Sequence, residues 1–246
     1  MKPSPLFALA AALACGGASA GDIDPAWNTS AELGAITTSG NTAGTSVTGK
    51  IDARQELESW SNQYIAAGYF KEDEKTLSNG DTVTVKSAER FSLSAKAAYK
   101  LMENGKKLFV LGTYVDDQFG AYTTYSTMAI GHAWGWDNAL DRRIDLEVGP
   151  GYFSGTRANG EAESGFTVRG AAAVRWRLSP AAVFSHTVSV ERGSSNVHSI
   201  AEAALATKIN DTMQMKAAFA ARNDTNVPAN KKNTDTQTSI TLVYSF

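Results

Sequence analysis

Three histidines are the first residues of this chain to examine for chemistry. His132, His186 and His198 lie in separate segments, and no sequence spacing places any of them beside a serine and an acidic or amide partner. A catalytic triad needs those groups within hydrogen-bond reach of one another. The chain also shows no metal-ligand spacing, phosphate loop or nucleotide fingerprint. We therefore predict no enzyme, no metal site and no cofactor.

Charged side chains are the second group that the sequence singles out, because many of them recur on alternate residues. The basic members are Lys50, Arg54, Arg90, Lys96, Lys100, Arg169, Arg175, Arg177, Lys216 and Arg222. The acidic members are fewer: Glu32, Asp52, Glu56, Asp145, Glu147 and Glu202. The whole chain is nearly neutral, with 23 basic and 25 acidic residues, so a nucleic-acid partner is not expected.

The elements that must position these charges repeat with a period of two. Polar and apolar residues alternate through 45–57, 85–101, 166–178 and 239–246, among other segments. A helix would repeat its apolar residues every three to four positions, so this pattern predicts β-strands. About 12 such segments follow one another, an even number of the kind that single-chain bacterial barrels have.

The strand length and the connections favour a membrane barrel over a soluble β-sandwich. Many segments reach about ten residues, the length that a tilted membrane-spanning strand needs. Tight turns near 58–59, 103–105, 179–180 and 210–211 alternate with longer polar loops at 72–82, 154–164 and 223–234. We predict an all-β fold, a transmembrane antiparallel up-and-down β-barrel of about 12 strands.

The aromatic residues indicate two girdles at the two membrane interfaces. One group falls near the short turns: Trp60, Tyr99, Trp134, Trp136, Trp176 and Tyr244. The other falls near the long loops: Tyr69, Phe119, Tyr122, Tyr152 and Phe166. His132, two residues before Trp134, is interpreted as an interfacial side chain, whereas the facing of His186 stays open.

The first twenty residues are typical of an export signal. Lys2 supplies positive charge, 6–15 is a short apolar run, and Ala18-Ser19-Ala20 is a small-residue cleavage site. We predict a signal peptide at 1–20 and one barrel domain at 21–246, located in the bacterial outer membrane. The alternative is a lipoprotein acylated at Cys15, the chain's one cysteine.

Two glycine-containing stretches predict local features of the backbone. Ser39-Gly40-Asn41 is suited to a tight turn between the first two strands, because Gly and Asn tolerate positive φ. Pro150, between Gly149 and Gly151, cannot donate a ladder hydrogen bond. It predicts a bend near a strand end at the outer rim, with a ligand-contacting kink as the alternative.

The end of the chain, 240–246, resembles the terminal signal of outer-membrane barrels, with Tyr244 and Phe246 as its aromatic members. That resemblance implies recognition by the barrel-assembly machinery. Further stretches, 31–34 with 38–42, 148–152 and 235–246, resemble the salt-induced outer membrane protein family (YdiY-like), a family of unknown function. This second resemblance implies a barrel and an outer-membrane location, and it carries over no catalytic residues.

Facing the polar side of each strand inward gives a predicted lumen. Its lining residues are Arg54, Arg90, Lys96, Arg169, Arg175, Arg177, Asp145 and Glu147. One interpretation is a narrow wet pore for small solutes whose basic wall favours anions. The other is a structural or stress-response envelope protein whose charges pair and fill the lumen. A lipid hydrolase on the outer wall is the third interpretation.

The expected partners are outer-membrane lipids and, during biogenesis, the assembly machinery. The barrel is expected to be a monomer.

Overall fold

The computed structural model describes residues 27–38, 44–78, 81–101, 105–138, 141–227 and 232–246. These residues form twelve strands. The strands are β1 (Trp27–Thr38), β2 (Gly44–Glu56), β3 (Trp60–Thr76), β4 (Thr82–Lys100), β5 (Lys106–Asp117), β6 (Tyr122–Asn138), β7 (Arg142–Arg157), β8 (Ala162–Ser179), β9 (Ala182–Arg192), β10 (Val197–Lys208), β11 (Met213–Asp224) and β12 (Thr234–Ser245). The described residues contain no helix that is long and apolar enough to cross a membrane.

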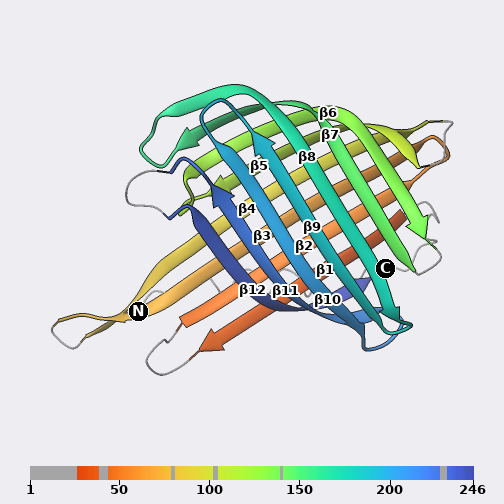
Figure 1. Ribbon diagram of the computed structural model, residues 1–246. Coiled ribbons are helices and arrows are strands. Elements are labelled where there is room, and N and C mark those ends of the chain that lie inside the picture. The colour runs from red at the N-terminus through yellow and green to blue at the C-terminus, as the bar shows by residue number, and fades with distance from the viewer. Residues whose placement is uncertain (1–26, 39–43, 79–80, 102–104, 139–140, 228–231) are drawn as a thin grey trace.

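Every strand pairs antiparallel with its neighbours in sequence, and β12 returns to β1, so the sheet closes into a barrel (Figure 1). The predicted fold class and strand count are confirmed. Odd-numbered strands run from one end, here called the turn end, where β1 begins and β12 finishes. They finish at the opposite end, here called the loop end. The predicted signal peptide, Cys15 and the 39–41 turn lie outside the described residues.

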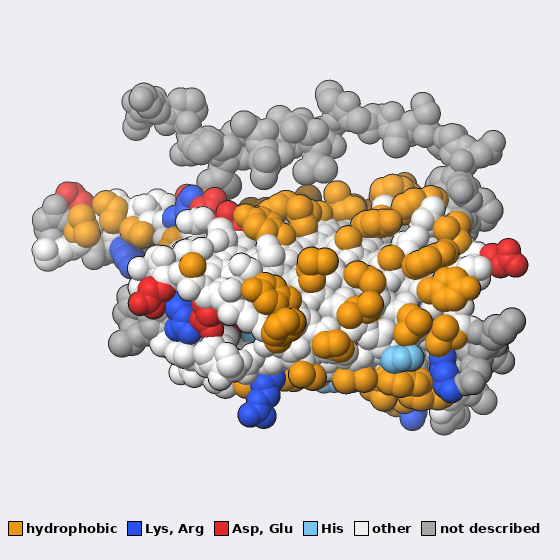
Figure 2. Space-filling view, turned by 90° about the horizontal axis from the view of Figure 1, so that it is seen from above, with side chains coloured by type: hydrophobic (Ala, Val, Ile, Leu, Met, Phe, Trp, Pro, Cys, Tyr) orange, Lys and Arg blue, Asp and Glu red, His pale blue; other side chains and the backbone are white. Residues whose placement is uncertain are grey.

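The period-two pattern separates an apolar outer wall from a polar interior. Outward side chains such as Met128, Ile130 and Phe166 are largely exposed, Phe166 at 85%. Figure 2 shows hydrophobic side chains spread along the wall, with most charged side chains toward the two ends. Inward side chains include Phe109, which is 1% exposed. Such an exposed apolar band is unsuited to water and suited to hydrocarbon.

Apolar side chains fill one side of the interior. Ala98, Phe109, Leu111 and Ala129, from β4, β5 and β6, form a buried cluster. Charged side chains such as Lys96 lie beside this cluster on β4. The described residues include no helix that fills the lumen.

Two segments that were predicted as loops are mostly strand. β3 and β4 pair as far as Thr76 and Thr82, so most of 72–82 belongs to the ladder. Their neighbours stop earlier: β2 pairs with β3 only to Asp73, and β5 pairs with β4 only to Arg90. The β3–β4 hairpin therefore projects beyond the loop end (Figure 1). The 154–164 segment is likewise strand except at its centre.

A close approach of β6 and β7 explains the glycines around Pro150. Ala129 pairs with Gly151 and His132 pairs with Val148, and the residues between these two pairs have no partner in the β6–β7 register. A Cβ atom on Gly131 or on Gly149 would collide with the backbone of the facing strand. The prediction of a bend at the outer rim is wrong, because Pro150 lies in the middle of β7.

The seam between β1 and β12 is short. Only Ser30 to Leu33 of β1 are in register with β12 partners, whereas β1 and β2 pair along the whole of β1. Two hydrogen bonds between the backbones of Thr29 and Phe246 extend the seam by one pair at the turn end. The strands that close the barrel are thus joined over a fraction of their length.

The aromatic residues of the turn end lie as expected on the outer wall. Trp60 contacts Tyr99, and His132 stacks on Trp134 with ring centroids 5.8 Å apart. Two loop-end assignments are wrong, because Tyr69 lines an interior cavity and Tyr122 is buried inside the barrel. His186 pairs across the sheet with Val174 and Ala203, which places it on the outer face.

Candidate functional site

The barrel interior is the candidate site, because charged side chains converge there around several cavities. Cavities of about 120, 250, 250 and 350 Å³ follow one another along the lumen. A water molecule in the liquid occupies about 30 Å³, so these spaces accommodate several waters each. Three features of the lumen are described in turn: a central ion-pair group, a ring layer near the loop end and a basic mouth at the turn end.

The central ion-pair group crosses the lumen. Lys96 of β4 contacts Glu147 of β7, two strands that are not neighbours in the sheet. Glu147 also lies 3.9 Å from Arg169 of β8, and Arg169 lies 2.9 Å from Glu191 of β9. Lys96, Glu147 and Arg169 line both of the 250 Å³ cavities, so the group stands between them.

The ring layer narrows the lumen toward the loop end. Tyr125 of β6 meets the ring of His198 of β10 with centroids 5.8 Å apart, which links two strands that are not neighbours in the sheet. The Tyr125 hydroxyl accepts a 3.3 Å hydrogen bond from Arg90, which pairs with Asp117 at 3.1 Å. The Nδ1 atom of His198 lies 2.9 Å from Asp224.

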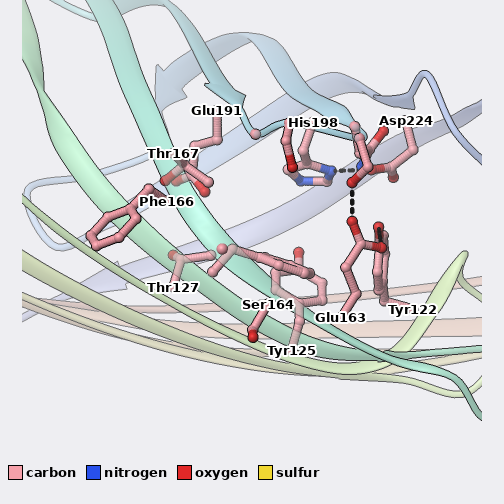
Figure 3. A pocket seen from close by; sticks show the side chains of 16 residues that line it. Tyr122, Tyr125, Thr127, Glu163, Ser164, Phe166, Thr167, Glu191, His198 and Asp224 are labelled. Atoms are coloured by element: carbon pink, nitrogen blue, oxygen red, sulfur yellow. Dashed lines mark hydrogen bonds and ion pairs between the residues drawn. The ribbon is translucent and has the colours of Figure 1, made fainter.

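Glu163 anchors a second polar cluster beyond this layer, shown in Figure 3. Its carboxylate accepts hydrogen bonds from the Tyr122 hydroxyl at 2.9 Å, from Arg157 at 2.7 Å and from Ser195. Tyr122, Glu163 and Ser195 line a pocket of about 40 Å³. This pocket is smaller than the other lumen cavities described above.

Carboxylates neutralise Lys50 and Arg54 of β2 and Lys216 of β11. Lys216 lies 3.2 Å from both Glu32 and Glu202, and Lys50 lies 3.7 Å from Glu32. Arg54 is held by Asp52 at 3.1 Å. Asp52 also accepts hydrogen bonds from Gln63.

The basic mouth at the turn end is different, because its basic side chains are unequally neutralised. Lys100 pairs with Glu56 at 3.0 Å, and Arg143, the cross-strand partner of Arg175, pairs with Asp137 and Asp145. Arg175 and Arg177 line the 350 Å³ cavity. Arg177 reaches Asp141 only at 3.9 Å, and Arg175 has no ion pair among the described residues.

The eight predicted lumen residues share the inner face but do not form one cluster. Arg90, Lys96, Arg169, Asp145 and Glu147 line the interior cavities, and Arg175 and Arg177 line the mouth. Arg54 shares the inner face with Asp52 and Gln63. Sequence reasoning missed the carboxylates of Asp117, Glu191 and Asp224. Glu191 follows the alternation Thr187, Ser189, Glu191, which was the available signal.

The interior offers little for catalysis. His198 has an acidic partner, but its Nε2 atom is buried with no hydrogen-bond partner among the described residues. No serine or threonine hydroxyl therefore stands where this base would activate it. No group of metal-ligating side chains occurs within the part of the chain that is described.

The comparisons with known proteins agree with this architecture. Superposed on an outer membrane channel from Pseudomonas putida F1, the chain gives a TM-score of 0.54 at 11% identity, covering 92% of this chain and 100% of the other. The NanC porin gives 0.50 at 6% identity, covering 89% and 98%. These similarities show the shared fold of outer-membrane barrels. A comparison with curated protein sequences finds no match.

The sequence itself matches one catalogued family over almost the whole described barrel. The match spans residues 31–246, from the fifth residue of β1 to the final Phe246. The chain therefore belongs to the family described as "Protein of unknown function, DUF481".

Proposed function

We propose that this protein is an outer-membrane pore that passes small solutes, with a preference for anions, through a narrow charged lumen. The observation that carries the proposal is the succession of charged cavities along the barrel interior. Two solved structures that share the fold are a channel and a porin, which supports the same reading. The apolar outer wall suits insertion in a membrane.

The pore is narrow because side chains cross it at two levels. Lys96 meets Glu147 at the centre, and Tyr125 meets His198 near the loop end. Hydrated ions and small solutes pass such constrictions only when the side chains move aside. We therefore expect single channels of low conductance.

The preference for anions rests on the basic residues that carboxylates leave unmatched. Among the described residues Arg175 has no ion pair, and Arg222 has no ion pair but donates hydrogen bonds to the neutral Gln237 at 3.4 and 3.5 Å. Unmatched positive charge raises the local concentration of anions and lowers that of cations. The paired central group adds little to this field.

A planar bilayer with different salt concentrations on its two sides tests the pore. We expect the wild-type reversal potential to indicate anion preference, and Arg175→Glu to move it toward cations. The shift should shrink near 1 M salt, where the Debye length is about 3 Å. Lys86→Glu, on the projecting hairpin, is the matched control and should leave the reversal potential unchanged. Absence of any wild-type current would remove the pore proposal.

The second candidate is a structural or stress-response envelope protein without transport. The chain of pairs from Lys96 through Glu147 and Arg169 to Glu191 favours it, because paired charges can hold a lumen shut. Its expected signature is a folded barrel with no current and a cellular level that rises when cells are moved to high salt. An outer-wall lipid hydrolase has no comparable support.

Export is proposed together with this function. We propose a signal peptide that is cleaved after Ala20, leaving a barrel domain from residue 21 that the assembly machinery inserts as a monomer into the outer membrane. N-terminal sequencing of protein from the outer-membrane fraction should begin at Gly21. A lipid-modified Cys15 at the mature N-terminus would establish the lipoprotein alternative instead.

A further inference from the structure

The cavity at the basic mouth of the turn end is lined by basic side chains without acidic ones among the described residues. Arg175, Arg177 and Lys208 line this 350 Å³ cavity, together with Gln214 and Pro180. No carboxylate lines this cavity among the described residues. Every charged side chain of the described cavity wall is therefore a cation.

Other cations lie around Arg175. Arg177 is two residues further along β8, and Arg143 of β7, which is already paired with two carboxylates, is the cross-strand partner of Arg175. Arg54 belongs to β2, which lies opposite β8 in the ring of strands. Arg54 has its own carboxylate, Asp52, whereas Arg175 has no hydrogen bond or ion pair among the described residues.

Cations gathered around one cavity attract an anion, because an anion that lies between them relieves their mutual repulsion. The planar fork of arginine matches the oxygens of phosphate or carboxylate, and it binds them with two parallel hydrogen bonds. The cavity is about ten times the ~30 Å³ that one water occupies in the liquid, so an oxyanion fits with part of its hydration.

We propose that the turn-end mouth is a binding site for an oxyanion of the phosphate class, held by Arg175 and Arg177 with Lys208 beside them. The proposal deepens the proposed function, since it assigns the class of anion and the point of entry. It does not depend on conduction, because a site of this kind binds its ion even if the central ion pairs keep the lumen shut.

Calorimetric titration of the purified, folded barrel with inorganic phosphate at low chloride tests the site. We expect saturable binding to the wild type and at least a tenfold loss of affinity in the double variant Arg175→Gln, Arg177→Gln. Arg175→Lys keeps the charge and loses the fork, so its affinity should fall between the two. Lys86→Gln removes a cation at the opposite end and should bind as the wild type does.

Folding and the source of the anion are controlled separately. Each variant is first checked for the compact, heat-modifiable form, and Lys208→Gln, at the end of β10, gives a second measure if the double variant does not fold. The titration is repeated in phosphatidylcholine discs with and without phosphatidylglycerol. Equal affinities identify a soluble anion, whereas weaker phosphate binding with the anionic lipid identifies a headgroup that competes for the same site.

Two results would overturn the inference. One is a folded wild-type barrel that shows no saturable phosphate binding in either disc. The other is unchanged affinity in the folded variants at Arg175, Arg177 and Lys208. Binding without conductance would instead uphold the site and reject the pore, and conductance without binding would do the reverse.

Discussion

Glu147 is the carboxylate on which the central ion-pair group depends. One of its oxygens contacts Lys96 and the other lies 3.9 Å from Arg169, while its side chain is only 13% exposed. A pair that bridges separated strands in a poorly hydrated interior stabilises little by itself, but loss of one partner leaves a buried charge uncompensated. The strongest effects of substitution are therefore expected at the shared member.

Glu147→Gln should destabilise the barrel by about 1–3 kcal/mol, less than a fully buried pair would lose because water still reaches these side chains. The measurement is the midpoint of denaturant unfolding in lipid vesicles. Glu89→Gln breaks an exposed pair with Lys86 on the hairpin and should cost about 0–1 kcal/mol. Equal costs at the two positions would contradict the role given to Glu147.

Tyr125 decides how open the lumen is toward the loop end. Its ring lines both the 40 Å³ pocket and the 250 Å³ cavity beneath it, so Tyr125→Ala should join them. The expected result is a higher single-channel conductance with the barrel still folded. Tyr64→Ala removes the same ring from the outer wall, where it stacks on Trp27, and should leave conductance unchanged. An unchanged Tyr125→Ala channel would place the constriction elsewhere.

At the scale of the strand, glycine sets how closely β6 and β7 approach. Gly149 lies where a Cβ atom would collide with the carbonyl oxygen of Ile130, and the facing Gly131 has the same restriction. Overpacking of this kind typically costs about 1–3 kcal/mol. The two glycines therefore permit a contact that no other residue fits.

Gly149→Ala should lower the unfolding midpoint, because the strands must separate to admit one methyl group. Gly170→Ala is the matched control on the adjoining strand β8, where an added Cβ atom meets nothing within 4 Å. That control should be neutral or slightly stabilising, since alanine loses less backbone freedom on folding. A neutral Gly149→Ala variant would show that the ladder adjusts without cost.

The projecting β3–β4 hairpin offers a test of the orientation of the barrel in the membrane. Ser78 lies exposed at its tip, and we expect the loop end outside the cell, because outer-membrane barrels have their longer loops there. An epitope inserted at Ser78 should bind antibody on intact cells, whereas one inserted at Asp211, in a turn-end connection, should need permeabilisation. The reverse pattern would invert the topology.

Local periodicity was sufficient to predict the strands and their two faces, because alternate residues point to opposite sides whatever the strand pairs with. It did not predict how far β3 and β4 continue, since a polar segment can extend a hairpin that has left the membrane. Nor did it predict the carboxylate partners Asp117, Glu191 and Asp224. Those pairings join different strands, and spacing along one strand holds no information about register between strands.

At the scale of the whole molecule, Phe246 links the last strand to the first. The backbone of Phe246 exchanges hydrogen bonds of 3.2 and 2.9 Å with Thr29, at the beginning of β1. Its ring packs on Tyr244 with centroids 5.8 Å apart. A residue proposed as an assembly signal thus also closes the barrel.

These two roles separate by substitution. Phe246→Ala keeps the backbone hydrogen bonds and removes the ring, so it should reduce the amount of assembled barrel while the assembled fraction unfolds near the wild-type midpoint. Deletion of Phe246 removes both and should lower the yield and the midpoint. The measurement is the heat-modifiable fraction in isolated outer membranes. Normal yield from both variants would contradict recognition through this residue.

The short seam between β1 and β12 has a consequence for the lifetime of the finished barrel. All other neighbouring strands pair over more residues, so separating any of them breaks more ladder hydrogen bonds than separating β1 from β12. We therefore expect unfolding to begin with the parting of the first and last strands, where their register stops at Leu33 and Leu242. The lifetime of the native barrel would then depend on the few hydrogen bonds at that seam rather than on the long hairpins that make up most of its wall.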